Sequence, residues 1–390
     1  MKKVTKRGQP MGNSVSIVTC RSYTPDDVFQ HVHKSVDLLG GIDAFVKRGD
    51  RVLLKPNFLV GRAPEKCVNT HPEVVRAAAK LVLEAGARPI ISDSPQMGSA
   101  LKVAEKCGVA AVARELGIDI VEFEPVEVKN PEGKTFKHFT VGKAALEADR
   151  IINLPKLKTH GLTYLTLAVK NIFGCVPGMR KAQWHVKTSS QGNEYFSRML
   201  LDLYLLINPC LSIVDGIVAM EGRGPGFGTP RELGLIVAGT DALSVDAVIC
   251  DVLGLQPHQF PTVKVALEDG FNAAELHAID VRGESPATVR VRDFQFPPKI
   301  TEIKGFFKLF AGFLKRQLTT HPFIDMQQCK QCNSCAEACP MHCIAAHEGG
   351  LVVNTQECIQ CLCCTEVCPE GAIELKDGFL AGIFKFFKRD

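Results

Sequence analysis

Two cysteine arrays of identical spacing near the carboxyl end restrict the fold of this chain more than any other feature. Each array places three cysteines at three-residue steps, adds a fourth four residues later and ends with a proline. The first array is Cys329, Cys332, Cys335 and Cys339, and the second is Cys358, Cys361, Cys364 and Cys368. Three thiolates spaced this closely can surround three corners of an iron–sulfur cubane from one tight loop.

The fourth cysteine of each array begins a helix-like turn, from which it can reach the neighbouring cluster. The spacing therefore predicts two [4Fe-4S] clusters with crossed ligation. We expect one cluster on Cys329, Cys332, Cys335 and Cys368, and the other on Cys358, Cys361, Cys364 and Cys339. Cys343 and Cys363 fall outside the register and are expected to be ordinary small side chains.

Two other uses of these cysteines are compatible with part of the pattern. Paired C-x2-C units also build zinc ribbons, but a zinc ion needs four ligands and has no use for a third cysteine at the same step. Clusters that only hold the fold together are the second alternative. Single-electron transfer is the interpretation that the complete double array favours.

Length and composition predict two unequal domains. The chain has 390 residues, of which 46% are apolar and 23% charged, a balance typical of globular proteins. We expect a tail at 1–14, an α/β domain at 15–292, an amphipathic connector at 293–322, a cluster-binding domain at 323–377 and an aromatic and basic tail at 378–390. The two basic amphipathic segments could touch a membrane surface, but packing against their own domain is the preferred interpretation.

Short β-rich runs alternate with helix-period segments over the large domain, which predicts a mostly parallel sheet covered by helices. Strands are expected at 15–20, 51–55, 89–92, 150–154, 211–215 and 233–238. Runs such as RIINL are continuously apolar, as in a sheet covered on both faces. One helix is expected to begin in a capping box over 70–73 and to end at Gly86.

Charge and hydropathy bear on the partners and location. A net charge of +4 with scattered lysines and arginines does not indicate nucleic-acid binding. The start lacks the apolar stretch of a secretory signal, and no apolar run is long enough to span a membrane. The remaining cysteines are dispersed singly, which suits reduced thiols rather than disulfides. A cytoplasmic protein is therefore expected.

Polar side chains follow several of the predicted strands at their carboxyl ends, where α/β folds place ligands. We expect them to form one rim that binds an anionic small molecule. Its members are Lys55, Asn57, Asp93, Ser94, Lys156, Lys158, Thr159, His160, Lys170, Asn171 and Asp215. Each alone could be an ordinary turn former or a solvated lysine, and only their convergence favours a site.

Within this rim, His160, Lys158 and Lys156 are the candidate catalytic residues. His160 is the expected acid or base because the usual histidine pKa lies nearest neutrality, while lysines can stabilise an anionic intermediate. His71 and His185 are weaker candidates, the first because it begins a helix.

A glycine-rich segment at 221–228 could bring backbone amides close to an anion, through Gly222 and Gly224. Its spacing matches neither the dinucleotide nor the P-loop fingerprint. A lid or a plain loop is an equally good interpretation. Met220 and Glu221 are further candidates for a metal ligand or base.

Longer runs carry a family resemblance. Residues 329–369 resemble a bacterial-type 2[4Fe-4S] ferredoxin, which implies a small α+β domain and a separate redox partner protein. The large domain resembles the DUF362 family through LLKPNF at 53–58, THPEVVRAAAKLVLEAGA at 70–87, SDSP at 92–95, INLPKLKTHGLTYLTLAVKNIFGCVPG at 152–178 and IVDGIVAMEGRGPGFGTPRELG at 213–234. That family implies an architecture and a redox setting but no substrate.

Three functions remain open from the sequence. The first is an iron–sulfur oxidoreductase that passes electrons to an anionic ligand on the rim. The second is an electron-transfer or assembly partner whose large domain docks another protein, and the third is a non-redox enzyme with structural clusters. A lysine-lined pocket facing the cluster domain would favour the first, and a shallow apolar surface would favour the second.

Overall fold

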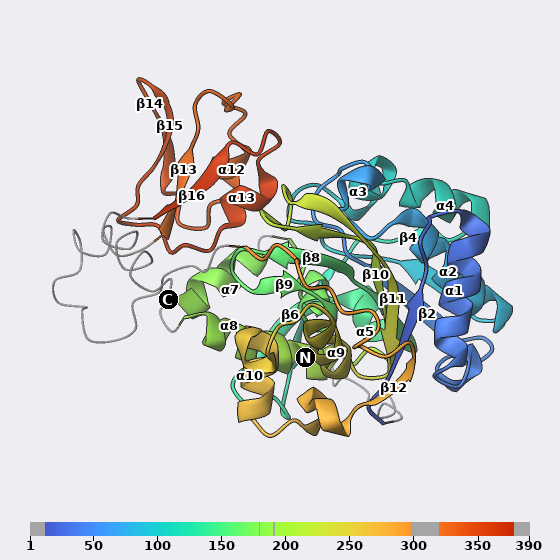
Figure 1. The fold of residues 1–390 in the computed structure, drawn as a ribbon. Helices are drawn as coiled ribbons and strands as arrows, with labels where there is room; N and C mark the ends of the chain where they lie inside the picture. Colours follow the sequence, from blue (N-terminus) through green and yellow to red (C-terminus); the bar gives the residue numbers. More distant parts are fainter. Residues whose placement is uncertain (1–11, 179, 190–191, 298–319, 378–390) are drawn as a thin grey trace.

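The computed structural model describes residues 12–178, 180–189, 192–297 and 320–377. Most of the predicted N-terminal tail and of the connector, and the predicted tail at 378–390, lie outside the described residues. Two bodies are visible in Figure 1: a large α/β domain and a small α+β domain, which is coloured orange to red. The expected fold class is therefore confirmed.

A ten-stranded sheet forms the centre of the large domain. Its main path is β12 (Asp280–Gly283), β1 (Ser14–Thr19), β11 (Thr229–Gly239), β10 (Leu211–Glu221), β7 (Arg150–Leu154), β2 (Arg51–Pro56), β3 (Arg88–Ile91) and β4 (Asp119–Ile120). Most neighbours are parallel, but β11 is antiparallel to both β1 and β10. A separate hairpin consists of β5 (Pro125–Lys129) and β6 (His138–Gly142).

Helices cover both faces of this sheet (Figure 1). One face carries α1 (Pro25–Asp37), α2 (Pro72–Glu84), α3 (Ala100–Lys106) and α4 (Val109–Leu116). The other is covered by α5 (Lys143–Glu147), α6 (Ala168–Asn171), α7 (Arg180–Ser189), α8 (Asn193–Ile207), α9 (Ala242–Val252) and α10 (Pro261–Glu268). Ile151 packs in one core and its neighbour Ile152 in the other, which explains why β7 is apolar throughout.

Two local predictions are corrected. Helix α2 ends before Gly86, which has a φ of +72°, as expected, but it has no capping box. His71 is the N-cap, and its side chain accepts a hydrogen bond from the Glu73 amide. The Thr70 hydroxyl instead donates a hydrogen bond to the Leu154 carbonyl. The predicted rim segment after β7 is a further strand, β8 (Lys156–His160), which pairs with β10 and β9 (Tyr164–Thr166).

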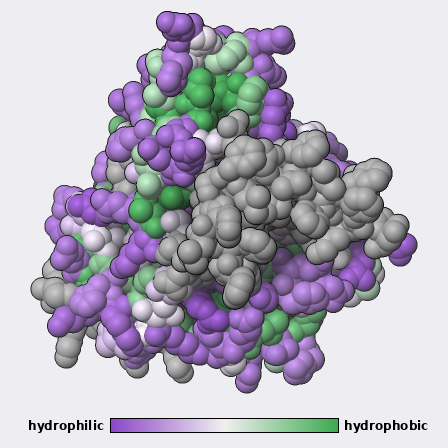
Figure 2. All heavy atoms as spheres, turned by 90° about the vertical axis from the view of Figure 1, so that its left-hand side faces the viewer, coloured by the Kyte–Doolittle hydropathy of each residue, from purple (hydrophilic) through white to green (hydrophobic). Residues whose placement is uncertain are grey.

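The small domain contains two antiparallel strand pairs and two short helices. The strands are β13 (Thr320–Ile324) with β16 (Ile373–Asp377) and β14 (Ile344–His347) with β15 (Gly350–Val353); the helices are α12 (Ser334–Glu337) and α13 (Cys363–Val367). It lies beside the β10–β11 hairpin and β8 of the large domain (Figure 1). Figure 2 shows an apolar area on its surface, surrounded by hydrophilic side chains.

Candidate functional site

The eight array cysteines surround two separate cavities in the small domain. Cys329, Cys332, Cys335 and Cys368 line the first together with Ile324, Leu351 and Ile373. Cys358, Cys361, Cys364 and Cys339 line the second, which Cys343 also borders. The Cys343 Sγ lies 3.4 Å from that of Cys339, a closeness that the sequence register did not indicate.

Backbone conformation repeats between the two arrays. Left-handed φ angles occur at Gln331, Asn333 and His342 and again at the corresponding positions of the second array, Gln360, Leu362 and Gly371. Five of these six residues are not glycine, and a left-handed conformation is unfavourable for them. The same costly turns in both halves wrap each loop around its cavity.

The cavities fit iron–sulfur clusters better than single zinc ions. The amides of Gln331 and Gln360 point at the Sγ atoms of Cys329 and Cys358, each at 3.4 Å, as occurs around cluster thiolates. Among the described residues, only Cys20, Asp27 and His31 bring three potential ligand atoms within 4.8 Å of one another. The array thiols are more widely spaced, which suits a four-iron cubane and not one tetrahedral ion.

The two domains meet around helix α13. The Nε2 of His160 lies 3.1 Å from the Oε1 of Glu366, and both side chains are buried. Gly161 gives Leu362 room, because a Cβ at Gly161 would lie 2.5 Å from the leucine Cδ1. The cluster-bearing helix therefore packs directly on the end of β8.

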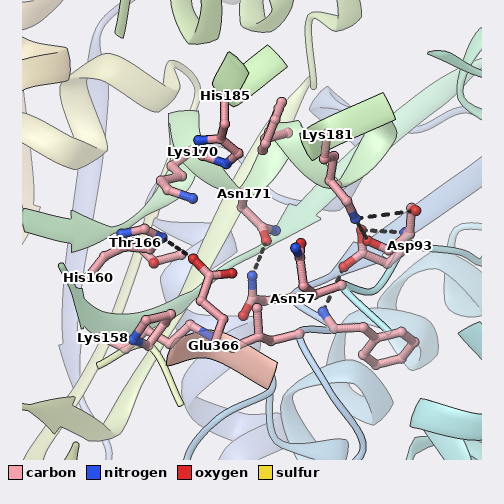
Figure 3. A pocket seen from close by; sticks show the side chains of 17 residues that line it. Asn57, Asp93, Lys158, His160, Thr166, Lys170, Asn171, Lys181, His185 and Glu366 are labelled. Carbon is pink, nitrogen blue, oxygen red and sulfur yellow. Dashed lines mark hydrogen bonds and ion pairs between the residues drawn. The ribbon is translucent and has the colours of Figure 1, made fainter. Parts of the chain in front are cut away.

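A small pocket of about 60 Å³ lies at this interface. Figure 3 shows side chains from several elements of the large domain and Glu366 of the small domain around it. Its polar lining is Asn57, Asp93, Ser94, Gln96, Lys158, His160, Thr166, Lys170, Asn171, Lys181, His185 and Glu366. The volume suits a few waters or a small anionic group.

Lysine side chains give the pocket its charge. Burial lowers the pKa of Lys158 to about 7 and that of Lys181 to about 8, and it also lowers the pKa of Lys170. Lys158 donates to the Val68 carbonyl, and Lys181 donates to the carbonyls of Ser94 and Pro95. Three lysines thus face Glu366, the one carboxylate of the described lining that has no lysine partner.

His160 is held as a neutral donor. Its Nδ1 accepts the amides of Leu162 at 3.1 Å and Thr163 at 3.4 Å, so Nε2 carries the proton and donates to Glu366. Burial lowers the pKa of His160 to about 4 and that of His185 to about 3. Burial would raise the pKa of Glu366, but the His160 hydrogen bond and nearby Lys170 lower it to about 2.

Several polar atoms of the pocket lack partners within the part of the chain that the structure describes. The Asn57 Oδ1 and the Thr166 Oγ1 are buried without a hydrogen bond. The Lys170 ammonium likewise has no hydrogen-bond or ion-pair partner among the described residues, and it points into the pocket in Figure 3. Buried polar groups are normally satisfied, so these atoms mark the position of a polar ligand or of ordered water.

The predicted rim is divided by the structure. Asn57, Asp93, Lys158, His160, Lys170 and Asn171 line the pocket, whereas Lys55 lies outside it with its Nζ 2.9 Å from the Asp93 Oδ1. Lys156 and Asp215 form a different buried pair at 2.8 Å, joined by the Tyr23 hydroxyl. His71 stacks on Tyr23.

The glycine-rich segment connects β10 with β11. Gly222 and Gly224 do not line the pocket, although Pro225 does. Gly224 packs on Thr159, to which its amide donates at 3.1 Å. The Glu221 carboxylate lies 3.0 Å from the Gln295 amide, and Met220 packs in an apolar cluster with Val60 and Val68.

Sequence reasoning missed four polar lining residues: Gln96, Thr166, Lys181 and Glu366. Glu366 carried one available signal, because it lies between Cys364 and Cys368 at the position that Glu337 occupies in the first array. Glu337 borders a second interdomain cavity, of about 470 Å³, which shares Asp93, Ser94 and Gln96 with the first pocket.

Fold and cavities together define an iron–sulfur protein with a large α/β domain. The chain belongs to the family described as "Domain of unknown function (DUF362)", whose sequence profile matches residues 52–251. A 4Fe-4S dicluster domain follows at residues 321–369, so the chain contains an iron–sulfur cluster-binding domain. The resemblance seen in the sequence is thereby confirmed.

Among known proteins, the chain is similar to the thylakoid-associated protein sll1697 of Synechocystis sp. The two are 45% identical over 268 residues, which are 68% of this chain and 83% of that protein. None of the described helices is long and apolar enough to cross a membrane.

Two solved structures share a more distant likeness. Lactate racemase apoprotein from Thermoanaerobacterium thermosaccharolyticum matches 60% of this chain and 55% of its own, with 11% identity and a TM-score of 0.38. A protein from Thermotoga maritima matches 56% of each chain, with 13% identity and a TM-score of 0.35.

Proposed function

We propose that the protein is an iron–sulfur oxidoreductase that binds two [4Fe-4S] clusters and passes their electrons to a small anionic ligand between the domains. The proposed ligands of the first cluster are Cys329, Cys332, Cys335 and Cys368, and those of the second are Cys358, Cys361, Cys364 and Cys339. When bound, each cluster would supply one electron at a time.

The position of Glu366 is the observation that carries this proposal. This residue lies two positions from both Cys364 and Cys368, and its carboxylate lines the lysine pocket. A ligand in that pocket would therefore sit beside the helix that joins both cysteine sets. Electron transfer needs such proximity, and a docking module without substrate chemistry has no need of a lysine-lined pocket.

The lining supports an anionic ligand. Among the described residues, the Lys170 ammonium has no hydrogen-bond or ion-pair partner, and the Asn57 Oδ1 and the Thr166 hydroxyl are buried without a hydrogen bond. Lys158 and Lys181, with pKa values of about 7 and about 8, hold protons that can be exchanged near neutral pH. Reduction of a C=O or C=C bond takes two electrons and two protons, and an external one-electron donor protein would replace the electrons.

The first experiment is anaerobic purification with iron and sulfide analysis, followed by EPR spectroscopy of the photochemically reduced protein. About eight irons per chain and a reduced-cluster signal are expected. Fumarate and pyruvate, as short carboxylates with reducible bonds, then serve as oxidants. Reoxidation should be lost in Lys158→Ala and His160→Ala but kept in the surface variant Lys102→Ala. Unchanged reoxidation in the pocket variants would favour the docking alternative.

Crossed ligation has its own test. Replacing Cys335 and Cys368 together by serine should remove one cluster and leave about four irons, since both are proposed to bind the same cluster. Replacing Cys335 and Cys339 together should damage both clusters. The reverse pattern, with only one cluster lost in the Cys335 and Cys339 variant and both damaged in the Cys335 and Cys368 variant, would show that ligation is not crossed.

The redox partner and the location belong to the same proposal. We propose a separate redox protein as the electron donor, and the cytoplasm as the location, because the cysteines outside the arrays suit reduced thiols. The name of the Synechocystis relative suggests membrane association as the competing location. Fractionation of cells at low and high salt distinguishes the two.

A further inference from the structure

The large domain contacts the two halves of the small domain unequally. Because the two cysteine arrays have the same spacing, the turn that begins at Cys368 corresponds to the turn that begins at Cys339. Among the described residues, side chains of the β10–β11 connection and of the loop after β2 donate hydrogen bonds to the Cys368 turn and not to the Cys339 turn.

Arg62, from the loop after β2, holds the Cys368 turn. Its Nη2 donates to the carbonyls of Cys368 at 3.1 Å and Pro369 at 3.2 Å. The guanidinium also lies 5.4 Å from the centre of the Phe227 ring. Phe227 packs closely on Gly371, where an added Cβ would lie 2.6 Å from a ring atom.

Arg223, from the β10–β11 connection, holds the same turn from a second direction. Its Nη2 donates to the carbonyls of Ile373 at 3.2 Å and Gly371 at 3.4 Å. Within the same turn, the Ala372 amide points at the Cys368 Sγ at 3.3 Å. Two positive charges thus lie on the turn that presents this one thiolate.

The other half of the repeat lacks this arrangement. Among the described residues, no arginine or lysine side chain donates to the corresponding carbonyls of Cys339, Pro340, His342 and Ile344. Among the described residues, the asymmetry in hydrogen bonds to these carbonyls therefore comes from the large domain, while the small domain itself adds a Lys330–Glu370 ion pair at the Cys368 turn.

We propose that Arg62, assisted by Arg223, is a positioning residue that makes the two clusters inequivalent. It holds the small domain in place and raises the reduction potential of the cluster assigned to Cys329, Cys332, Cys335 and Cys368. Reduction adds negative charge to a cluster, and a nearby guanidinium stabilises that charge. Arg62 has the larger effect, because Arg223 is exposed and more strongly screened by solvent. This inference rests on the proposed binding of two clusters.

The test is an anaerobic potentiometric titration of the full chain, followed by EPR. Arg62→Gln should lower one of the two potentials and leave the other unchanged, and Arg62→Lys should lower it less. The exposed Arg114→Gln variant, with the same change in net charge, should shift neither. The shifted signal should be the one that disappears in Cys332→Ser.

Two further measurements keep the outcome decisive. Small-angle scattering reports whether the two domains stay together. If Arg62→Gln separates them, the role of Arg62 in holding the small domain is supported, and the effect on the reduction potential is then tested with Arg223→Gln. Unchanged potentials, or equal shifts of both in a compact variant, would overturn the inference. Iron analysis separates the two hypotheses, since failure to bind two clusters refutes the proposed function itself.

Discussion

Replacement of Lys170 by methionine should weaken anion binding while making the protein more stable. The Lys170 ammonium lies in the interdomain pocket without a hydrogen-bond or ion-pair partner among the described residues. Burial lowers its pKa because the charged form loses hydration without gaining a compensating ion pair. Methionine keeps most of the apolar stem and removes the charge.

The size of the binding effect follows from the missing partner. A hydrogen bond to a charged group is worth about 1.5–3 kcal/mol, which corresponds to a loss of affinity of about 10- to 150-fold. No internal acceptor among the described residues competes for this ammonium, so most of that energy should appear in ligand affinity. Relief of its desolvation should raise stability by about 1–2 kcal/mol.

Isothermal titration with fumarate and phosphate measures the affinity, and circular dichroism measures the apparent Tm. Lys102→Met, which removes an exposed lysine on α3, is the control for net charge. An unchanged affinity in Lys170→Met would refute the assignment of the pocket as an anion site. A lower apparent Tm would show instead that Lys170 stabilises the domain interface.

Three further predictions concern the residues around this pocket. In the folded protein, His160 and His185 have pKa values of about 4 and about 3. When the pH falls below the usual histidine pKa, both side chains are therefore protonated in the unfolded chain but stay neutral in the folded one. The free energy of unfolding should thus fall by about 2 kcal/mol per histidine between pH 6.5 and 5. In thermal melts, His185→Phe should reduce this dependence of stability on pH. An unchanged pH dependence would contradict the assignment of His185 as a buried neutral histidine. Asp93→Ala removes the partner of buried Lys55 and the acceptor of the Phe58 and Ser94 amides, so it should lower the free energy of unfolding by about 3–5 kcal/mol. The control is Asp293→Ala, which breaks an exposed pair with Arg231 and should change the Tm little. Equal losses of stability in the two variants would argue against the buried pair. Gly174→Ala should disrupt the same pair, because the added Cβ would lie 1.9 Å from the Asp93 Oδ1, and it should lower the free energy of unfolding by about 1–3 kcal/mol. The control is Gly349→Ala, whose added Cβ would meet no atom within 4 Å. A Gly174→Ala variant as stable as the unmodified protein would contradict this packing.

Features set by local residue order were predictable. The cysteine spacing, repeated with its proline, indicates a cluster domain because loops this short leave the thiols few arrangements. The end of α2 at Gly86 and the strands β1, β2, β3 and β7 follow from glycine chemistry and continuous apolar runs. The sheet is mostly parallel, as the alternation of strand and helix predicted.

Strand-end position did not decide which polar residues share a site. Lys156 and Lys158 lie two residues apart on β8, yet Lys156 pairs with Asp215 and Lys158 lines the pocket. The pairing of β8 with β10 is interrupted between Asp215 and Met220, so the two lysines meet different neighbours. No sequence pattern reports such an irregularity, which coincides with a register shift between Gly216 and Val218 in the pairing of β10 with β11.

The sequence by itself determined that this chain carries an iron–sulfur domain and a large α/β domain, since spacing and periodicity act over a few residues. Only the tertiary structure decided that Glu366 of the small domain completes a pocket built by Lys158 and Lys170 of the large one. Burial between the domains also lowers the pKa of His160 to about 4 and places its Nε2 3.1 Å from the Glu366 carboxylate. Desolvation and contacts across the interface depend on residues far apart in the chain, and local residue order does not encode them.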